Sequence, residues 1–325
     1  MEINGRAISI DLGGTKCSAA LVNQDGELFQ YQSVELAGAR GKAVGEMVLE
    51  MIEVLLAHAA LKHRDVVGIG ISVPGISDQR RQNVWAPNIE GWEKFPLQRY
   101  LKDHLTRHDL PIMIESDRGC SVLGEHWKGI AQGSKHVIYL SVGTGIGAGI
   151  MVDGRLIRGS HDIAGAIGWM ALQRPFDARF KSCGNFEYYA SGEGLVRAAK
   201  ELGSLQASKL FTKGAVRGYT AEELFESFTK NDQVAVKVIE QAVELWGMAC
   251  ANLVSLFNPE IIVFGGGVFG PAVQFLERIY REAIRWAQPV AMRQVRFVET
   301  ALKGNAPLLG AAYNVFTKEE GSQSQ

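Results

Sequence analysis

The sequence has no long hydrophobic run and no excess of charge of either sign. None of its apolar segments reaches the roughly 20 residues that a membrane-spanning helix needs, and the N-terminus lacks the charged-then-apolar pattern of a signal peptide. Lys and Arg total 34 against 35 Asp and Glu, so we expect binding neither to nucleic acid nor to a membrane. Four cysteines lie far apart (Cys17, Cys120, Cys183 and Cys250), which is typical of a reduced, cytoplasmic protein.

Apolar residues, by contrast, are plentiful. They make up 46% of the 325 residues against 21% charged, a normal globular mixture in a chain long enough for two domains. The polar end GSQSQ predicts a disordered tail, which we place at 318–325.

The segment 7–23 brings together an acid, two glycines, a hydroxyl and a cation. An apolar strand leads to Asp11, and Gly13-Gly14-Thr15-Lys16 separates it from a second alternating run. The N–H groups of such a turn point outwards, and glycines let an anion come close to them. Asp11 is placed to hold a water bound to a metal ion. The segment matches what a nucleoside triphosphate with Mg²⁺ requires, although an ordinary glycine hairpin would have the same pattern.

The same pattern returns in the middle of the chain. A predicted strand at 136–142 is followed by Gly143-Thr144-Gly145 and by a second strand at 146–152. In both copies an Asp-Gly pair follows, at Asp25-Gly26 and Asp153-Gly154. This repetition predicts two related α/β domains with a cleft between them, each offering a glycine turn to one nucleotide.

Periodicity predicts the remaining elements. Short runs predict strands at 27–34, 66–73, 111–115, 260–264 and 295–298. Helical spacing predicts helices at 40–63, 97–108, 193–201, 220–229, 233–257, 271–287 and 307–316. Residues 83–95 predict a loop packed by its own aromatics, and Asp117 is placed to cap the helix that follows it.

Six motifs occur together and in order along the chain. They are DLGGTK at 11–16, Val73-Pro74-Gly75, APNIEGW at 86–92, ESD at 115–117, SVGTGIGAG at 141–149 and GGGV at 265–268. Together they resemble the ROK family of bacterial sugar kinases (repressor, open reading frame, kinase), within the actin-like ATPase superfamily. The resemblance implies a two-lobed, ribonuclease H-like α/β fold. Residues 1–117, completed by a helix at 306–317, would form one domain and residues 118–305 the other.

The resemblance also implies a role for each motif. Asp117 matches the catalytic base, which accepts a proton from the attacking sugar hydroxyl. The residues that would bind ATP are Asp11 (to Mg²⁺ through water), Gly13, Gly14, Thr15 and Lys16 at the β- and γ-phosphates, Gly143, Thr144 and Gly145 at a second phosphate turn, and Gly266 and Gly267 along the adenosine. Gly75, Asn88, Ser116, Asp117, Trp169 and Glu187 would line the sugar.

The predicted sugar site departs from the family. Ser116 replaces the usual Asn before the base, and Ala166 and Trp169 replace the Glu and His of Glu-x-Gly-His. The family's three zinc cysteines are reduced to Cys183, so we expect no zinc and a buried Cys183 thiol. The loop at 174–183 would then be held by packing of Phe176, Phe180 and Phe186.

Loss of the Glu and His changes the expected substrate. A site built on hydrogen bonds discriminates by about 10⁴–10⁵ against a ligand that lacks the partner. Trp169 is expected either to offer the sugar an apolar stacking face or to be a core aromatic. We therefore predict an ATP- and Mg²⁺-dependent kinase of a modified ring, such as an amino sugar, an anhydro sugar or a cyclitol, rather than of plain glucose.

Alternatives from other classes also fit the sequence. One is a catalytically weak sugar-binding sensor that keeps the nucleotide site, and a third, weaker one is an actin-like ATPase acting on a protein partner. Repressors of the family carry a DNA-binding segment ahead of the first strand, and because only six residues precede Ala7 we expect a kinase instead. The resemblance further implies a homodimer.

Overall fold

The computed structural model describes residues 5–61, 65–205 and 220–322. Within those ranges, no helix combines the length and the apolar character that crossing a lipid bilayer demands. The chain divides into two compact units. Unit 1 consists of Met1–Gly133, Leu156–Ala164 and Ala301–Gln325, and unit 2 consists of Ser134–Arg155 and Gly165–Thr300.

Unit 1 is built on a five-stranded sheet with the order β3-β2-β1-β4-β7. Its strands are β1 (Arg6–Leu12), β2 (Lys16–Val22), β3 (Leu28–Glu35), β4 (Val66–Val73) and β7 (Ile112–Ser116), and a separate hairpin joins β5 (Ile76–Asp78) to β6 (Asn83–Trp85). Strands β1, β4 and β7 are parallel, whereas β2 pairs antiparallel with both β1 and β3. The register aligns Asp11 with Ser72 and Ser72 with Glu115. The carboxyl ends of the parallel strands therefore meet at one edge of the sheet.

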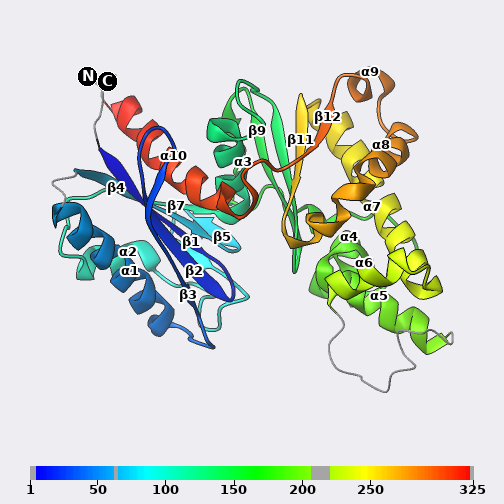
Figure 1. The fold of residues 1–325 in the computed structure, drawn as a ribbon, viewed down its shortest axis with the longest axis horizontal. Helices are drawn as coiled ribbons and strands as arrows, with labels where there is room; N and C mark the ends of the chain where they lie inside the picture. Colours follow the sequence, from blue (N-terminus) through cyan, green and yellow to red (C-terminus); the bar gives the residue numbers. More distant parts are fainter. Residues whose placement is uncertain (1–4, 62–64, 206–219, 323–325) are drawn as a thin grey trace. The chain divides into compact units, whose positions relative to one another are not determined.

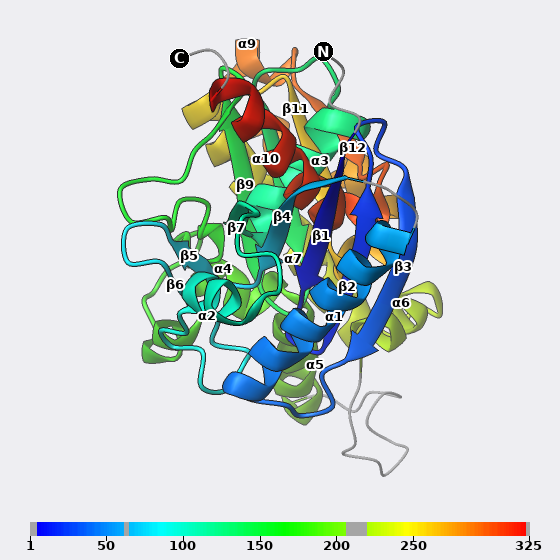
Figure 2. The same cartoon turned by 90° about the vertical axis from the view of Figure 1, so that its left-hand side faces the viewer.

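Helices cover both faces of this sheet (Figures 1 and 2). The helices of unit 1 are α1 (Lys42–Leu61), α2 (Leu97–His104), α3 (Asp117–Lys128) and α10 (Ala306–Ser322). Successive side chains of a strand point to opposite faces. Ile8 and Ile10 of β1 accordingly pack in the cluster that includes α1, while Ala7 packs with Leu308 of α10. Ser9 Oγ donates a hydrogen bond to the Leu308 carbonyl on that second face.

Helices α3 and α10 lie close together because of two glycines. A Cβ atom added at Gly310 of α10 would lie 1.7 Å from the carbonyl oxygen of Cys120 in α3. One added at Gly124 of α3 would lie 2.2 Å from the carbonyl oxygen of Ala306. Both obstacles are backbone atoms of the neighbouring helix, so no side-chain rotation relieves the clash. The position of α3, which begins at Asp117, thus depends on α10.

We expect Gly310→Ala to lower the free energy of unfolding by about 1–3 kcal/mol, the usual cost of overpacking a core. The added methyl group would force α3 and α10 apart, and this cost outweighs the gain of up to about 1 kcal/mol in helix propensity. Urea denaturation measures the change. Gly304→Ala is the matched control, because a Cβ there would meet nothing within 4 Å. A Gly310→Ala variant as stable as the wild type would contradict the close helix contact.

Unit 2 repeats the strand arrangement of unit 1. Its sheet has the order β10-β9-β8-β11-β12, with β9 antiparallel to β8 and with β8, β11 and β12 parallel. The strands are β8 (Val137–Val142), β9 (Ile146–Val152), β10 (Arg155–Leu156), β11 (Ile261–Gly265) and β12 (Arg296–Glu299). In each sheet the first two strands of the unit are joined by a glycine turn, as the sequence repetition predicted.

One hydrophobic cluster forms the core of unit 2. The helices are α4 (Asn185–Ala190), α5 (Gly192–Leu205), α6 (Ala221–Thr229), α7 (Gln233–Phe257), α8 (Leu276–Ile284) and α9 (Pro289–Met292), with 3₁₀ turns η1 (Ile167–Trp169), η2 (Ala178–Ser182), η3 (Gly267–Phe269) and η4 (Pro271–Phe275). Helix α7 supplies fully buried residues to the cluster, among them Ala242 and Trp246. Trp246 Nε1 donates to the Ala190 carbonyl at 3.1 Å, which attaches α4 to this core.

Two predicted helix boundaries near the core are wrong. Helix α2 ends at His104 rather than His108, because the amide and hydroxyl of Thr106 donate to the Glu53 carboxylate in α1 instead of continuing the helix. The predicted helix at 271–287 starts as the 3₁₀ turn η4, and α8 covers only its middle part. The predicted end of the first helix at residue 63 lies outside the described residues.

The last helix is longer than predicted. Helix α10 continues to Ser322, so most of the segment 318–325 that we expected to be disordered is helical instead. Lys318, Glu319 and Glu320 are good helix formers, which accounts for the continuation. Residues 323–325 of the predicted tail lie outside the described residues.

Candidate active site

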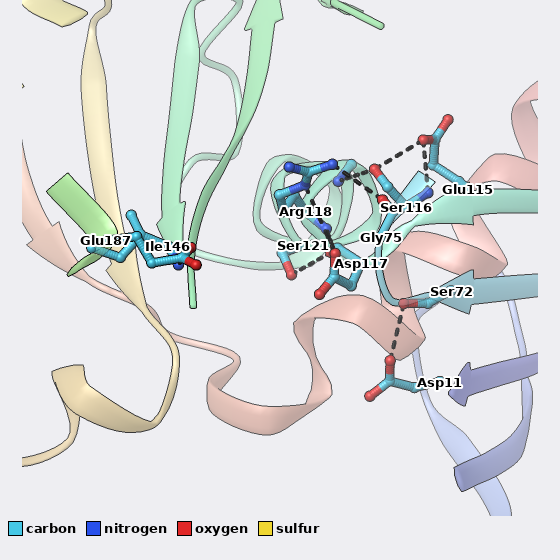
Figure 3. Close-up of polar contacts among 11 residues, drawn as sticks. Asp11, Ser72, Gly75, Glu115, Ser116, Asp117, Arg118, Ser121, Ile146 and Glu187 are labelled. Atoms are coloured by element: carbon cyan, nitrogen blue, oxygen red, sulfur yellow. Dashed lines mark hydrogen bonds and ion pairs between the residues drawn. The ribbon is translucent and has the colours of Figure 1, made fainter. Parts of the chain in front are cut away.

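Asp117 is the first residue of α3 and follows β7 directly. Ser116 is the N-cap, since its Oγ accepts a hydrogen bond from the Gly119 N–H at 3.2 Å. The interpretation of Asp117 as the cap is therefore wrong. Asp117 Oδ1 accepts from the Arg118 N–H at 2.8 Å, and the side chain is 43% exposed (Figure 3). The carboxylate is thus free of the capping role and reachable from outside.

Arg118 connects Asp117 to the loop after β4. Its Nη2 donates to the Gly75 carbonyl at 3.1 Å, and its Nε lies 3.9 Å from Asp117 Oδ1. Desolvation by the surrounding protein raises the pKa of Asp117, and the charge of Arg118 opposes that shift. A carboxylate with a raised pKa holds a proton more readily, which suits a general base.

Asp11 lies at the carboxyl end of β1, beside Ser72 of β4. Ser72 Oγ donates to Asp11 Oδ1 at 3.0 Å (Figure 3). Burial raises the pKa of Asp11 to about 6, the Ser72 hydrogen bond opposes this shift, and the charge of Asp117 adds to it. Two carboxylates that repel each other at one sheet edge would be stabilised by a divalent cation.

The turn between β1 and β2 is open to the outside at its tip. The Gly13 N–H donates to the Lys16 carbonyl at 2.8 Å and closes the turn, while Gly14, Thr15 and Lys16 are exposed. A Cβ added at Gly14 would lie 3.2 Å from Asn88 Cβ. Unit 1 therefore brings a residue predicted to bind phosphate next to one predicted to bind sugar.

The loop that carries Asn88 is packed by aromatic side chains only in part as predicted, because residues 83–85 form β6 and Trp85 is exposed. Trp92 is fully buried, stacks on Phe95 with ring centroids 4.4 Å apart, and donates its Nε1 to the Gly41 carbonyl at 2.9 Å. Asn88 itself is exposed. On the other side, Gly75 has φ +89°, and a Cβ there would lie 2.2 Å from the Trp85 carbonyl. Only glycine fits that position, which holds the loop after β4 against β6.

Unit 2 contains a cavity of about 610 Å³. The turn after β8 contributes Gly143 and Thr144, η3 contributes Gly267 and Val268, and α5 contributes two cations, Arg197 and Lys200. A Cβ added at Gly143 or Gly267 would meet nothing within 4 Å, so a ligand has access to the backbone at both positions. The cavity brings together two glycine segments that the sequence assigned to one nucleotide.

Gly145 and Gly266 serve the packing of the protein itself. Gly266 has φ +86°, and its Cβ would lie 2.4 Å from the Val142 carbonyl. A Cβ at Gly145 would lie 2.8 Å from Glu187 Oε2. Neither glycine is among the described residues that line the cavity.

The predicted sugar-contacting residues of unit 2 have different environments. Glu187 Oε2 accepts a hydrogen bond from the Ile146 N–H at 2.6 Å (Figure 3). Trp169 is 57% exposed, so the interpretation of Trp169 as a core aromatic is wrong. Its exposed ring is free to contact a ligand.

The loop at 174–183 is held differently from the prediction. Phe180 and Phe186 are buried, but Phe176 is 72% exposed and touches only the edge of this group, with its ring centroid 6.3 Å from that of Phe180. Cys183 is half-buried rather than buried, and it precedes Gly184, the N-cap of α4. Among the described residues, no three His, Cys, Asp or Glu side chains are grouped to hold a metal ion. The lack of zinc stays a prediction.

Several residues of unit 1 were missed from the sequence. Arg158 Nε donates to the buried Glu115 at 2.6 Å, and Glu115 in turn accepts from the Ser116 N–H at 2.8 Å. No local pattern links Arg158 to Glu115, which lies 43 residues away. Ser72 was predictable from strand register, because the parallel pairing of β1 and β4 places it opposite Asp11.

The chain belongs to the ROK family, whose family model matches residues 7–318. It is 28% identical to a glucokinase of Halalkalibacterium halodurans, over 97% of this chain and 96% of that protein. It is 30% identical to the xylose repressor of Caldicellulosiruptor bescii, over 94% of this chain and 77% of that protein.

A solved structure shows the same fold. The ROK family glucokinase from Streptomyces griseus, in complex with glucose and AMPPNP, is 30% identical, with a TM-score of 0.76 over 95% of this chain and 98% of that one. The predicted fold class, the α/β fold of the actin-like ATPase superfamily, is confirmed. Similar proteins thus include both sugar kinases and repressors, and the similarity supports sugar kinase activity.

Proposed function

We propose that this protein is an ATP-dependent kinase that uses Mg²⁺ to phosphorylate a hydroxyl group of a hexose or hexose-like ring. The observation that supports this most is the environment of Asp117. It is a reachable carboxylate with a raised pKa, at the carboxyl end of the parallel strands and within the electrostatic influence of Asp11. Proteins of similar sequence and fold include glucokinases, one of them bound to glucose and AMPPNP.

In the proposed reaction, each unit contributes its own residues. Asp117 accepts the proton of the attacking sugar hydroxyl. The Gly13–Lys16 turn offers N–H groups, the Thr15 hydroxyl and the Lys16 charge to the phosphates, and Asp11 would hold Mg²⁺ through a water. In unit 2, Gly143 and Thr144, with Gly145 closing the turn behind them, form the second phosphate turn. The Gly266-Gly267 segment lies along the adenosine through the open backbone of Gly267. Mg²⁺, when bound, offsets the charge on the phosphoryl group that is transferred.

The proposed substrate is a modified ring rather than plain glucose. Gly75, Asn88, Ser116, Trp169 and Glu187 are its proposed contacts. The hydroxyl of Ser116 already donates to Glu115 and accepts from Gly119, and Glu187 accepts from Ile146, so both have protein partners. The exposed ring of Trp169, in place of a histidine, favours a stacking contact over a hydrogen bond. An amino sugar, an anhydro sugar or a cyclitol fits such a site.

A catalytically weak sugar sensor is the second candidate function. Ala166 and Trp169 replace a hydrogen-bonding pair, and a repressor is among the similar proteins. ADP release from ATP, measured with a panel of sugars and cyclitols, separates the two. A kinase releases ADP with one member of the panel and loses this activity in Asp117→Asn. A silent panel together with measurable sugar binding would favour the sensor. We also propose that the protein is located in the cytoplasm and that it assembles as a homodimer. Sedimentation measures the second property.

We expect Arg118→Met to move the acid limb of the pH profile of kcat/KM to higher pH. The charge of Arg118 lowers the pKa of Asp117 and opposes the desolvation that raises it, so removal of this charge raises the pKa further. Arg118→Lys keeps the charge and is the matched control, with its acid limb close to that of the wild type. Identical limbs in Arg118→Met and the wild type would contradict this electrostatic role.

A further inference from the structure

The Glu187 carboxylate is anchored beneath the turn that joins β8 to β9. Its Oε2 accepts a hydrogen bond from the Ile146 N–H at 2.6 Å, and Ile146 is the residue directly after Gly145 (Figure 3). Glu187 belongs to the first turn of α4, whose Phe186 and Ala190 are fully buried in the core of unit 2. A rigid core element therefore holds the carboxylate in place.

Two glycines enclose this carboxylate. A Cβ added at Gly145 or at Gly168 would lie 2.8 Å from Glu187 Oε2. At Gly168 it would also lie 2.9 Å from the Ile146 carbonyl oxygen. Any larger residue at either position would displace the carboxylate or the backbone around it. Gly145 and Gly168 thus leave room for the Glu187 carboxylate beside the turn.

The turn is fixed at its other end as well. The Gly192 N–H, at the start of α5, donates to the Gly143 carbonyl at 2.8 Å, and the Gly143 N–H donates to the Gly145 carbonyl at 2.9 Å. Together with the Glu187 contact, these bonds secure both ends of the turn. Thr144 is left exposed at the tip, where it and Gly143 line the 610 Å³ cavity.

We propose that Glu187 is a positioning residue for nucleotide binding, which fixes the Gly143–Gly145 turn so that Gly143 and Thr144 face the cavity. The inference rests on the proposed function, since it takes the ligand of this cavity to be a nucleoside triphosphate. It is a role of Glu187 in addition to the sugar contact proposed above, because it depends on the hydrogen bond between Oε2 and the turn. A carboxylate that accepts an N–H from the turn acts on the affinity for the nucleotide whether or not a sugar is bound.

The test measures binding of AMPPNP by calorimetry in the absence of any sugar. Glu187→Ala removes the acceptor, so we expect it to weaken AMPPNP binding by about tenfold or more. Glu187→Gln keeps an oxygen that accepts from Ile146 and should stay within about threefold of the wild type. Gly168→Ala keeps the carboxylate but pushes against it, and should weaken binding without altering a residue that lines the cavity. Glu244→Ala, on the exposed side of α7, is the matched control and should bind as the wild type does.

The outcomes separate the inference from the proposed function. Wild-type protein that does not bind AMPPNP overturns both. Wild-type binding that is unchanged in Glu187→Ala and in Gly168→Ala overturns the inference alone and leaves Glu187 as a sugar ligand. A loss in Glu187→Gln as large as that in Glu187→Ala overturns the hydrogen-bond mechanism. A thermal melt of each variant checks that it is folded. If Glu187→Ala does not fold, the comparison of Gly168→Ala with Glu187→Gln tests the inference.

Discussion

Asp117→Asn will lower kcat by about 10²–10⁴-fold, the contribution typical of a positioned general base. Asparagine has the size of aspartate but does not accept a proton from the sugar hydroxyl. Its backbone contacts are kept, including the 2.7 Å hydrogen bond from Ser121 Oγ to the carbonyl of residue 117. We therefore expect the free energy of unfolding to stay within about 1 kcal/mol of the wild type, in the range of a mild substitution. Steady-state ADP release and urea denaturation measure the two effects.

Asp103→Asn is the matched control for this prediction, because it removes an exposed carboxylate from α2 in the same unit. It should leave kcat unchanged. Turnover by Asp117→Asn above about a tenth of the wild-type rate would exclude Asp117 as the base, since even a modest general base contributes more than that.

Asp11→Asn has the second large expected effect. At pH 8 we expect it to raise the free energy of unfolding and to abolish the kinase activity. Burial raises the pKa of Asp11 from 3.8 to about 6, so the folded protein binds this proton more tightly than the unfolded chain does. The protonated carboxyl contributes fully to the free energy of unfolding below about pH 4, and this contribution is lost as the pH rises through 6. At pH 8 the ionised carboxylate therefore costs the wild type about 1–3 kcal/mol. Asparagine avoids this cost and still accepts the Ser72 hydroxyl.

Urea denaturation at pH 8 and pH 4 tests the stability of Asp11→Asn. We expect the variant to be more stable than the wild type at pH 8 and equally stable near pH 4. Its kinase activity should be lost, and Mg²⁺ with nucleotide should stabilise only the wild type. Asp25→Asn, in the exposed turn between β2 and β3, should change none of these quantities. A stability difference that does not depend on pH would refute the assignment of the raised pKa to Asp11.

Features set by neighbouring residues were predictable from the sequence. Each glycine turn lies between two strands with alternating apolar residues, so the turns at 13–16 and 143–145 follow from local pattern. Helix α7 matches its predicted bounds because apolar spacing, the Asp232 cap and the stop at Asn258 agree. The alternating run around Ile8 and Ile10 likewise predicted the strand β1, but not that Ala7 and Ser9 on its other face are buried as well.

Features set by distant residues were not predictable. The end of α2 depends on Glu53, which lies 53 residues before Thr106. The partner of Glu187 lies 41 residues away, and a spacing shared with the family suggested a sugar contact instead of the contact with the turn. Trp169 is the last residue of the 3₁₀ turn η1, and nothing in the neighbouring sequence indicates that its ring is exposed. Such outcomes are decided by tertiary packing, which a single sequence does not encode locally.

Because α10 follows unit 2 in the chain, the order of synthesis determines when the contact between α3 and α10 can form. Unit 2 is made of two nearby stretches, so a nascent chain holds all of its sheet and core before α10 leaves the ribosome. The contact between α3 and α10, in contrast, can form only after Gly310 has been synthesised. A chain that terminates early would thus have unit 2 but lack the helix that packs against α3. A ribosome stalled before residue 306 should therefore leave the face of α3 that contacts α10 open to proteases.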